Sequence, residues 1–201
     1  MRIIFIYVLL FSVKLSAQIP FDDCKQVTDI ALAEQLAHQR IMEATNNILG
    51  NTSASNNFDV TYYRCEWDVN PAIRYISGKV TVYFYITTGT TNIQLDLMSP
   101  LIVDSVKQRN LVLVKQHASN TLTVNFSSTI NAGVLDSISI YYRGVPPNTG
   151  FGSFIQDQHL GIPVMWSLSE PYGSRDWWPC KNGLDDKADS IDIYITSPAQ
   201  Y

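Results

Sequence analysis

Most of the chain consists of short runs in which apolar and polar side chains alternate with a period of two. The run 76–87 is the clearest, because Val80, Val82, Phe84 and Ile86 would share one face of an extended strand. The expected strands are 58–69, 76–87, 93–97, 101–108, 111–116, 122–126, 137–142, 162–169 and 191–196. Strands that recur about every 8–15 residues, separated by Gly, Asn or Pro, are typical of antiparallel sandwiches. We therefore predict a mainly β domain over 58–201, with a core of inward-facing aliphatic and aromatic side chains.

Residues 22–50 follow a different period. Apolar residues recur there at steps of three and four, a stripe typical of an amphipathic helix: Ile30, Ala33, Ala37, Ile41, Ala44 and Ile48. Asp22 or Asp23 can cap the start of this helix, and Gly50 follows its end. The sequence thus predicts a short helical leader over 22–50 and a polar linker over 51–57.

The first 17 residues have the character of a secretory signal peptide. Arg2 precedes an apolar run, and the small residue Ala17 ends it. The run is shorter than the roughly 20 apolar residues that a membrane-spanning helix needs. We expect cleavage after Ala17 and a mature protein that is secreted or periplasmic, with no membrane span.

Charge and cysteine content exclude several classes of function. Loss of Arg2 and Lys14 with the signal peptide takes the basic residues from 14 to 12 against 18 acidic ones, a net charge of −6. A negative chain without a basic cluster argues against a nucleic-acid partner. The three cysteines, Cys24, Cys65 and Cys180, fit no disulfide framework or zinc-knuckle spacing, so we interpret them as small buried apolar residues. The sequence does not exclude that two of them pair.

One stretch, 166–180, breaks the alternation and gathers three of the four tryptophans. Within it, Glu170 stands directly before Pro171, which biases the glutamate toward an extended backbone. Aromatic side chains on both sides would lower the local dielectric constant and strengthen the attraction of a carboxylate for a cation. The simpler interpretation is a packed corner between strands in which Glu170 and Arg175 form a local ion pair.

The same stretch resembles a known family. Glu170-Pro171, then Arg175, then Pro179-Cys180, with Asp186-Lys187-Ala188 before the last strand, is similar to the signature that ends the amino-terminal domain of the aminopeptidase N family, the gluzincin zinc aminopeptidases. The likeness covers roughly 58–201, and the leader falls outside it. It implies a saddle-like, mostly antiparallel β-sandwich domain that precedes a catalytic domain.

The resemblance also implies roles for individual residues. The glutamate matching Glu170 reaches into the catalytic cleft and helps to bind the free α-amine of the peptide substrate. Arg175 would orient the loop, while Trp177 and Trp178 would pack against the catalytic domain. No His-Glu-x-x-His motif follows, and His38, His117 and His159 are isolated, so zinc is expected only in a catalytic domain that this chain lacks.

Two functions of different classes remain open. In the first, the chain is the substrate-anchoring, non-catalytic domain of an exported zinc aminopeptidase, inactive alone, and its abrupt end at Tyr201 after the last strand favours this interpretation. In the second, it is a stand-alone secreted β-sandwich whose aromatic side chains bind a sugar or a protein. A nucleophile-based hydrolase is disfavoured, because no Gly-x-Ser-x-Gly segment occurs.

Overall fold

The computed structural model describes residues 32, 35–36, 52–148, 153–170, 172–183 and 186–201, which are mainly β. Its strands are β1 (Phe58–Asn70), β2 (Ile73–Ile86), β3 (Thr90–Asp96), β4 (Ile102–Gln108), β5 (Leu111–Val112), β6 (Val114–Ala118), β7 (Thr121–Ile130), β8 (Leu135–Gly144), β9 (Ile155–His159), β10 (Ile162–Trp166) and β11 (Ser190–Thr196), and η1 (Ser174–Asp176) is a short 3-10 turn. Leu32, Gln35 and Leu36 are helical, and among the described residues no helix has the length and apolar character needed to cross a membrane.

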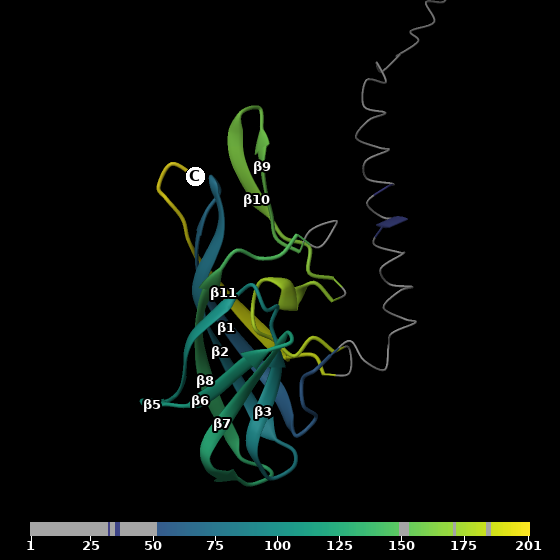
Figure 1. Cartoon of the computed structure of the whole chain (residues 1–201), viewed down its shortest axis with the longest axis vertical. Coiled ribbons are helices and arrows are strands. Elements are labelled where there is room, and N and C mark those ends of the chain that lie inside the picture. Colours follow the sequence, from purple (N-terminus) through teal and green to yellow (C-terminus); the bar gives the residue numbers. More distant parts are fainter. Residues whose placement is uncertain (1–31, 33–34, 37–51, 149–152, 171, 184–185) are drawn as a thin grey trace, which may run out of the picture.

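The strands form two layers and a separate hairpin. A six-stranded sheet has the order β11-β1-β2-β8-β4-β5, and a three-stranded sheet of order β3-β7-β6 lies in front of it in Figure 1. The hairpin of β9 and β10 projects from the upper end, close to the end of the chain. All strand pairs are antiparallel except β1 and β11, which are parallel. The predicted mainly β sandwich is confirmed, as a mixed rather than purely antiparallel structure.

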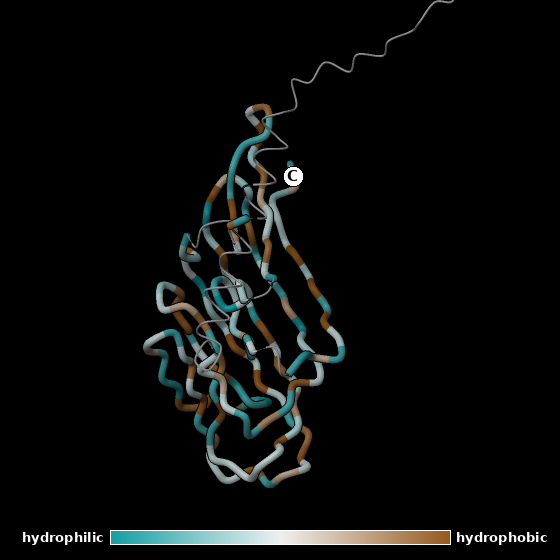
Figure 2. Tube along the Cα trace, turned by 90° about the vertical axis from the view of Figure 1, so that its right-hand side faces the viewer, coloured by the Kyte–Doolittle hydropathy of each residue, from teal (hydrophilic) through white to brown (hydrophobic). Residues whose placement is uncertain are grey.

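The core lies between the two layers and follows the alternation of the strands. Val80, Val82, Phe84 and Ile86 of β2 are at most 1% exposed, as the sequence predicts. Ile93 and Leu95 of β3 and Leu122 and Val124 of β7 meet them from the smaller sheet, and all four are fully buried. Figure 2 shows the apolar and polar segments alternating along the strands.

A bulge in β1 changes which of its residues face the core. The register with β2 shifts between Val60 and Tyr62. Before the bulge Phe58 and Val60 are buried, and after it the buried residues are Tyr63, Cys65 and Trp67. An extra residue in one strand reverses the parity of the alternation, so the bulge allows a single strand to present both sets to one core.

Several predicted strands need correction. The segment 111–116 is two strands in different sheets: β5 pairs with β4, whereas β6 pairs with β7, and Leu113 between them donates its N–H to Val106. The predicted strand 162–169 ends at Trp166 and is half of a hairpin whose first strand, β9, was not predicted. Its two-residue turn, Leu160-Gly161, has φ of 51° and 80°, as expected for a tight hairpin turn.

Other predictions fall largely outside the described residues. These are the signal peptide over 1–17 and most of the helical leader over 22–50, including Cys24. The linker 51–57 is described from Thr52, and it is bound to the β domain by hydrogen bonds: Ser55 donates its backbone N–H to the carbonyl of Gln94.

Candidate functional site: the Glu170 loop

The stretch predicted to carry the function is a loop that leaves β10 and returns to the sandwich at Cys180. Two hydrogen bonds close it on itself around Ser169. Gly173 donates its N–H to the carbonyl of Ser169 at 2.7 Å, and the indole Nε1 of Trp177 donates to the Ser169 hydroxyl at 3.0 Å. A Cβ on Gly173 would lie 2.4 Å from the Ser153 hydroxyl, so this close approach requires glycine. The residue directly before Glu170 is therefore fixed.

The loop's two tryptophans point into the domain. Trp177 and Trp178 are each only 8% exposed. The ring of Trp177 lies 4.5 Å from that of Trp67 on β1, and the ring of Trp178 lies 5.0 Å from that of Tyr63, edge to face. Most of the surface of both rings is therefore used inside the sandwich, although Trp177 also lines an open groove described below. Their packing against a catalytic domain stays a prediction.

The far side of the loop is bound to β3 through Asn182 and Asp96. The amide nitrogen of the Asn182 side chain donates to the carbonyl of Tyr172 at 3.0 Å, and its oxygen accepts the N–H of Arg175 at 3.4 Å. Asn182 in turn donates its backbone N–H to Asp96 Oδ2 at 3.1 Å. Asp96 and Cys180 form a β-bridge. This chain of bonds holds the loop at Tyr172 and at Arg175.

Asp96 is the centre of this network and was not singled out from the sequence. Its side chain is fully buried, and it also accepts hydrogen bonds from the Thr52 hydroxyl (2.6 Å), the Ser53 N–H (2.7 Å) and the Ser53 hydroxyl (2.8 Å). The only signal in the sequence is an acidic residue between two leucines at the end of a strand, Leu95-Asp96-Leu97. Its donors lie 43 or more residues away along the chain, and two of them, Thr52 and Ser53, belong to the predicted linker.

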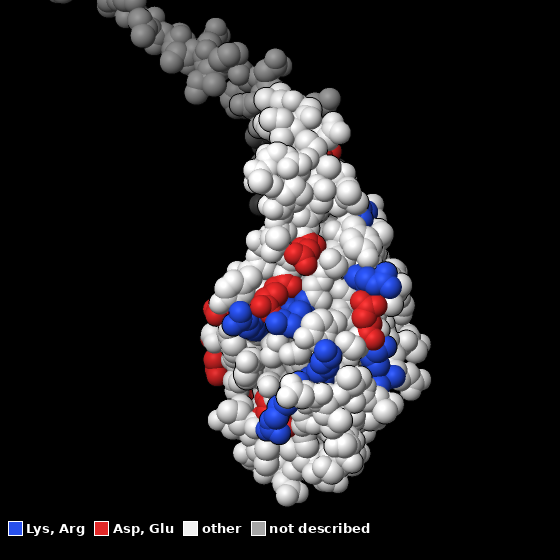
Figure 3. All heavy atoms as spheres, turned by 90° about the vertical axis from the view of Figure 1, so that its left-hand side faces the viewer, with Lys and Arg blue, Asp and Glu red and all other residues white. Residues whose placement is uncertain are grey.

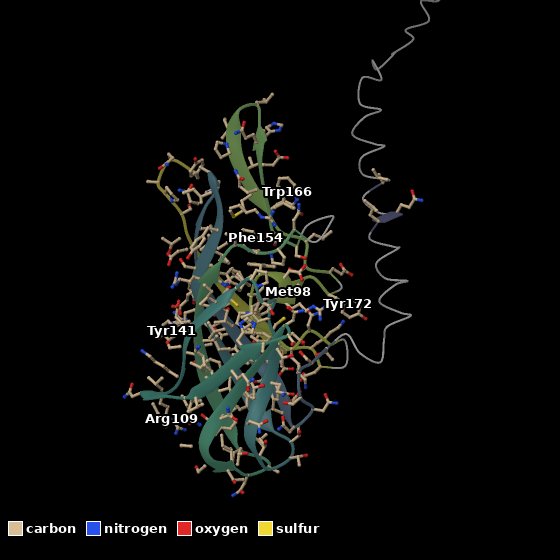
Figure 4. All side chains as sticks on the ribbon, viewed as in Figure 1. Met98, Arg109, Tyr141, Phe154, Trp166 and Tyr172 are labelled. Carbon is tan, nitrogen blue, oxygen red and sulfur yellow. The ribbon has the colours of Figure 1, made fainter. Side chains whose placement is uncertain are left out.

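Glu170 itself is exposed, in contrast to the residues around it. The ion pairs between described residues do not include it. The carboxylate thus stands on a loop whose backbone is fixed on both sides, and its side chain faces solvent. Figure 4 shows Tyr172, two residues later, at the outer edge of the molecule on the same loop.

The structure places Arg175 in the turn η1, where it is half-buried. Its backbone holds the loop to the sandwich, because the Arg175 carbonyl accepts the N–H of Met98 at 2.9 Å. Burial raises the pKa of the Cys180 thiol well above its ordinary value, and the positive charge of Arg175 offsets part of that rise. The orienting role of Arg175 stays a prediction, and the main-chain bond to Met98 is compatible with it.

A buried ion pair follows the loop. Lys181 Nζ lies 2.5 Å from Asp186 Oδ2 and also donates to the Phe58 carbonyl at 2.8 Å, and both charged side chains are 6% exposed. Asp186 is thus buried although it lies in an acidic segment of the sequence, and Asp185 lies outside the described residues. The pair joins the end of the loop to the start of β1, a partner 123 residues away that the local sequence does not reveal.

Cys65 and Cys180 are free and buried, as the interpretation of small apolar residues predicts. Burial raises the pKa of Cys65 to about 12. In the described part of the chain, no three His, Cys, Asp or Glu side chains lie together as metal ligands.

An apolar groove of about 380 Å³ lies at the base of the β9–β10 hairpin. Figure 4 shows Phe154 and Trp166 at this place, and Trp166 is 44% exposed. Its described lining carries no charged side chain: Trp67, Val69, Pro71, Phe154, Met165, Trp166, Ser167, Trp177, Ile195, Ser197 and Tyr201. The sequence indicated aromatic residues here but not the groove, since its walls come from β1, the hairpin, the loop and β11.

Comparison of the fold with known structures identifies relatives. Neither a protein-family model nor a curated protein sequence matches the chain. An M1 zinc metallopeptidase mutant from Deinococcus radiodurans, solved with a Tyr-Ser-Ala substrate, superposes with a TM-score of 0.65 at 21% identity, over 73% of this chain and 34% of that one. Native yeast LTA4 hydrolase superposes with a TM-score of 0.62 at 21% identity, over 74% of this chain and 24% of that one.

The described domain thus spans about a third of the bacterial peptidase and about a quarter of the yeast hydrolase. At this level of identity the likeness establishes the fold. The resemblance read from Glu170, Arg175 and Pro179-Cys180 is confirmed at that level: this chain has the fold of a domain found in M1 zinc metallopeptidases of the aminopeptidase N type.

Proposed function

We propose that this chain is the amino-terminal, non-catalytic domain of an exported zinc aminopeptidase, and that Glu170 anchors the α-ammonium group of the peptide substrate. The observation that carries the proposal is an exposed carboxylate on a loop that hydrogen bonds hold at Ser169 before it and at Tyr172 after it. The shared fold with M1 zinc metallopeptidases supplies the context. The zinc and its ligands belong to the catalytic domain, which is not in this chain.

The physical reason concerns how an aminopeptidase distinguishes a free chain end from an internal amide. A carboxylate removed from water at a domain boundary is a counter-ion for an ammonium group, and it is left unpaired by a substrate that lacks one. Anchoring the amine also sets the first peptide bond at a constant distance from the reacting centre. A loop with a fixed backbone suits this role, because little conformational freedom is lost when the substrate binds.

The test is Glu170→Gln in the protein that includes the catalytic domain. We expect KM for peptides with a free amino terminus to rise by at least about tenfold, equivalent to about 1.4 kcal/mol, with an unchanged unfolding midpoint. Glu66→Gln is the matched control, because Glu66 is a glutamate on β1 that pairs with Lys79 away from the loop. An unchanged KM in Glu170→Gln would remove the anchoring role.

A second candidate is a stand-alone secreted module that binds a sugar or a protein. The apolar groove beside Trp166 favours it, since exposed aromatic side chains bind both kinds of ligand. Reading the gene beyond Tyr201 separates the two candidates. A His-Glu-x-x-His motif downstream supports the aminopeptidase, whereas a stop codon at that point supports the module.

A further inference from the structure

The last strand, β11, has an apolar face that the domain does not cover. Ile191, Ile193 and Ile195 alternate with polar residues and are 45%, 52% and 63% exposed. In the parallel register with β1 they stand beside Tyr63, Cys65 and Trp67. Paired residues of neighbouring strands lie on the same side of a sheet, so the isoleucines continue the core face of β1 beyond the edge of the core.

The contrast between the two strands is large. Tyr63, Cys65 and Trp67 are at most 6% exposed, and the rings of Trp177 and Trp178 pack on Tyr63 and Trp67. The two tryptophan rings do not extend over β11, so its row of isoleucines is exposed to solvent. The six-stranded sheet is therefore one strand wider than the layer packed on it.

On the opposite face of β11, the side chains already have interaction partners within the domain. The hydroxyl of Tyr62 donates to Asp192 at 2.8 Å, and the guanidinium of Arg64 lies 4.7 Å from the centre of the Tyr194 ring. One side of the strand is thus a polar surface with its interactions made, and the other has the composition of a core. A strand of this kind is expected to bury its apolar side against another structure.

The exposed isoleucines continue into the apolar groove at the base of the hairpin. Ile195 belongs to both, and Tyr201 and Trp166, 42% and 44% exposed, extend the surface. Figure 3 shows the charged side chains gathered on the broad lower body of the molecule, while its narrow upper end is largely without them. The surface of the partner that packs on this region must accordingly be apolar, not charged or strongly hydrated.

We infer that the isoleucine face of β11 and the adjoining groove are the docking surface for the catalytic domain of the same peptidase. This inference rests on the proposed function, and the comparisons supply the occupant: the relatives are longer chains, and one is a two-domain metallopeptidase of which this fold covers 34%. Trp177 of the Glu170 loop packs mainly inside the domain and also lines this groove, so the loop and β11 contribute to one apolar surface.

The experiment is hydroxyl-radical footprinting of two proteins: the chain printed here, and the same chain extended through its catalytic domain. We expect oxidation of Met165, Trp166 and Tyr201 to be at least about fivefold slower in the extended protein. Tyr85 is the matched control residue, since it is 43% exposed on β2 and should react equally in both.

A pair of variants tests the isoleucines directly. Ile193→Thr in the extended protein should return the oxidation of Trp166 toward its rate in the short chain. Ile102→Thr should not, although Ile102 is 54% exposed on β4 and so matches Ile193 in type and exposure. Threonine favours strands, which keeps the secondary structure in both variants.

The outcomes separate this inference from the proposed function. An active aminopeptidase in which the groove oxidises as fast as in the short chain overturns the docking surface and leaves the function intact. A protected surface in a protein without aminopeptidase activity supports the docking surface and refutes the proposed function. If the short chain forms a dimer that Ile193→Thr dissociates, the occupant is a second copy and the inference is wrong, as it also is if the gene encodes no second domain.

Discussion

Replacing Asp96 with alanine tests how the Glu170 loop is held. The Asp96 side chain is fully buried and accepts four hydrogen bonds, three from Thr52 and Ser53 and one from the backbone N–H of Asn182. Asp96→Ala removes the common acceptor of the linker before β1 and of the segment after the loop. Both should loosen together.

The magnitude follows from which donors can reach water afterwards. Ser53 is exposed and Thr52 half-buried, so their groups can bond to solvent, whereas Asn182 is 5% exposed and its N–H is left without an acceptor. A buried unpaired donor costs about 1–3 kcal/mol, and a hydrogen bond to a charged group contributes about 1.5–3 kcal/mol. Relief of the carboxylate's desolvation offsets part of the sum. We expect a loss of about 3 kcal/mol, a large part of a typical domain stability of about 5–15 kcal/mol.

Urea unfolding followed by tryptophan fluorescence measures this loss. With a denaturant dependence of about 2 kcal/mol per molar, the midpoint should fall by about 1.5 M. Amide exchange at Arg175 and Asn182 should accelerate in the same variant. Asp104→Ala is the matched control, because Asp104 is also a strand aspartate but is 43% exposed and pairs with Arg143 on the surface. Such a pair contributes about 0–1 kcal/mol.

The reasoning is refuted if Asp96→Ala costs no more than Asp104→Ala. It is refuted equally if stability falls while amide exchange in the 172–182 segment does not change, because the network would then stabilise the domain without holding the loop. A variant too unstable to purify is replaced by Ser53→Ala, which removes one of the four bonds and should show the same pattern at smaller size.

Two further predictions concern the buried ionisable groups. Lys181→Met removes the cation that neutralises the buried Asp186 carboxylate, which keeps the Val60 N–H as a donor at 3.3 Å and has the Asp59 carboxyl beside it. The variant should cost about 3–5 kcal/mol in urea unfolding. Lys181→Met/Asp186→Leu should recover most of this loss, and a double variant no more stable than the single one contradicts the pairing. Burial raises the pKa of Cys65 to about 12 and also raises the pKa of Cys180, whereas an unfolded thiol titrates near about 8.5. The free energy of unfolding should therefore be constant below about pH 8.5. Above that pH it should fall, by up to about 1.4 kcal/mol per pH unit for each thiol, because only the unfolded state releases the protons. Unfolding midpoints that stay constant from about pH 8 to about pH 10.5 would contradict the burial of both thiols.

The sequence by itself determined the local structure and the location of the loop. Alternation at Val80, Val82, Phe84 and Ile86 predicts both the strand and its buried face, because the two-residue period of a strand is a local property of the chain. The spacing from Glu170 to Cys180 identified the loop and the fold to which it belongs. Neither result depends on which segments meet in space.

Only the tertiary structure decided which side chains are buried where the period is broken or partners are distant. The bulge after Val60 moves the core face of β1 to Tyr63, Cys65 and Trp67, and no local pattern marks an extra residue of this kind. Trp177 faces inward because Trp67, 110 positions earlier, gives it a surface to pack on. Asp96 and Lys181 are stabilised by donors and acceptors from remote segments. Burial of a polar group depends on the partners that the fold brings to it, and the order of residues along the chain does not specify those partners.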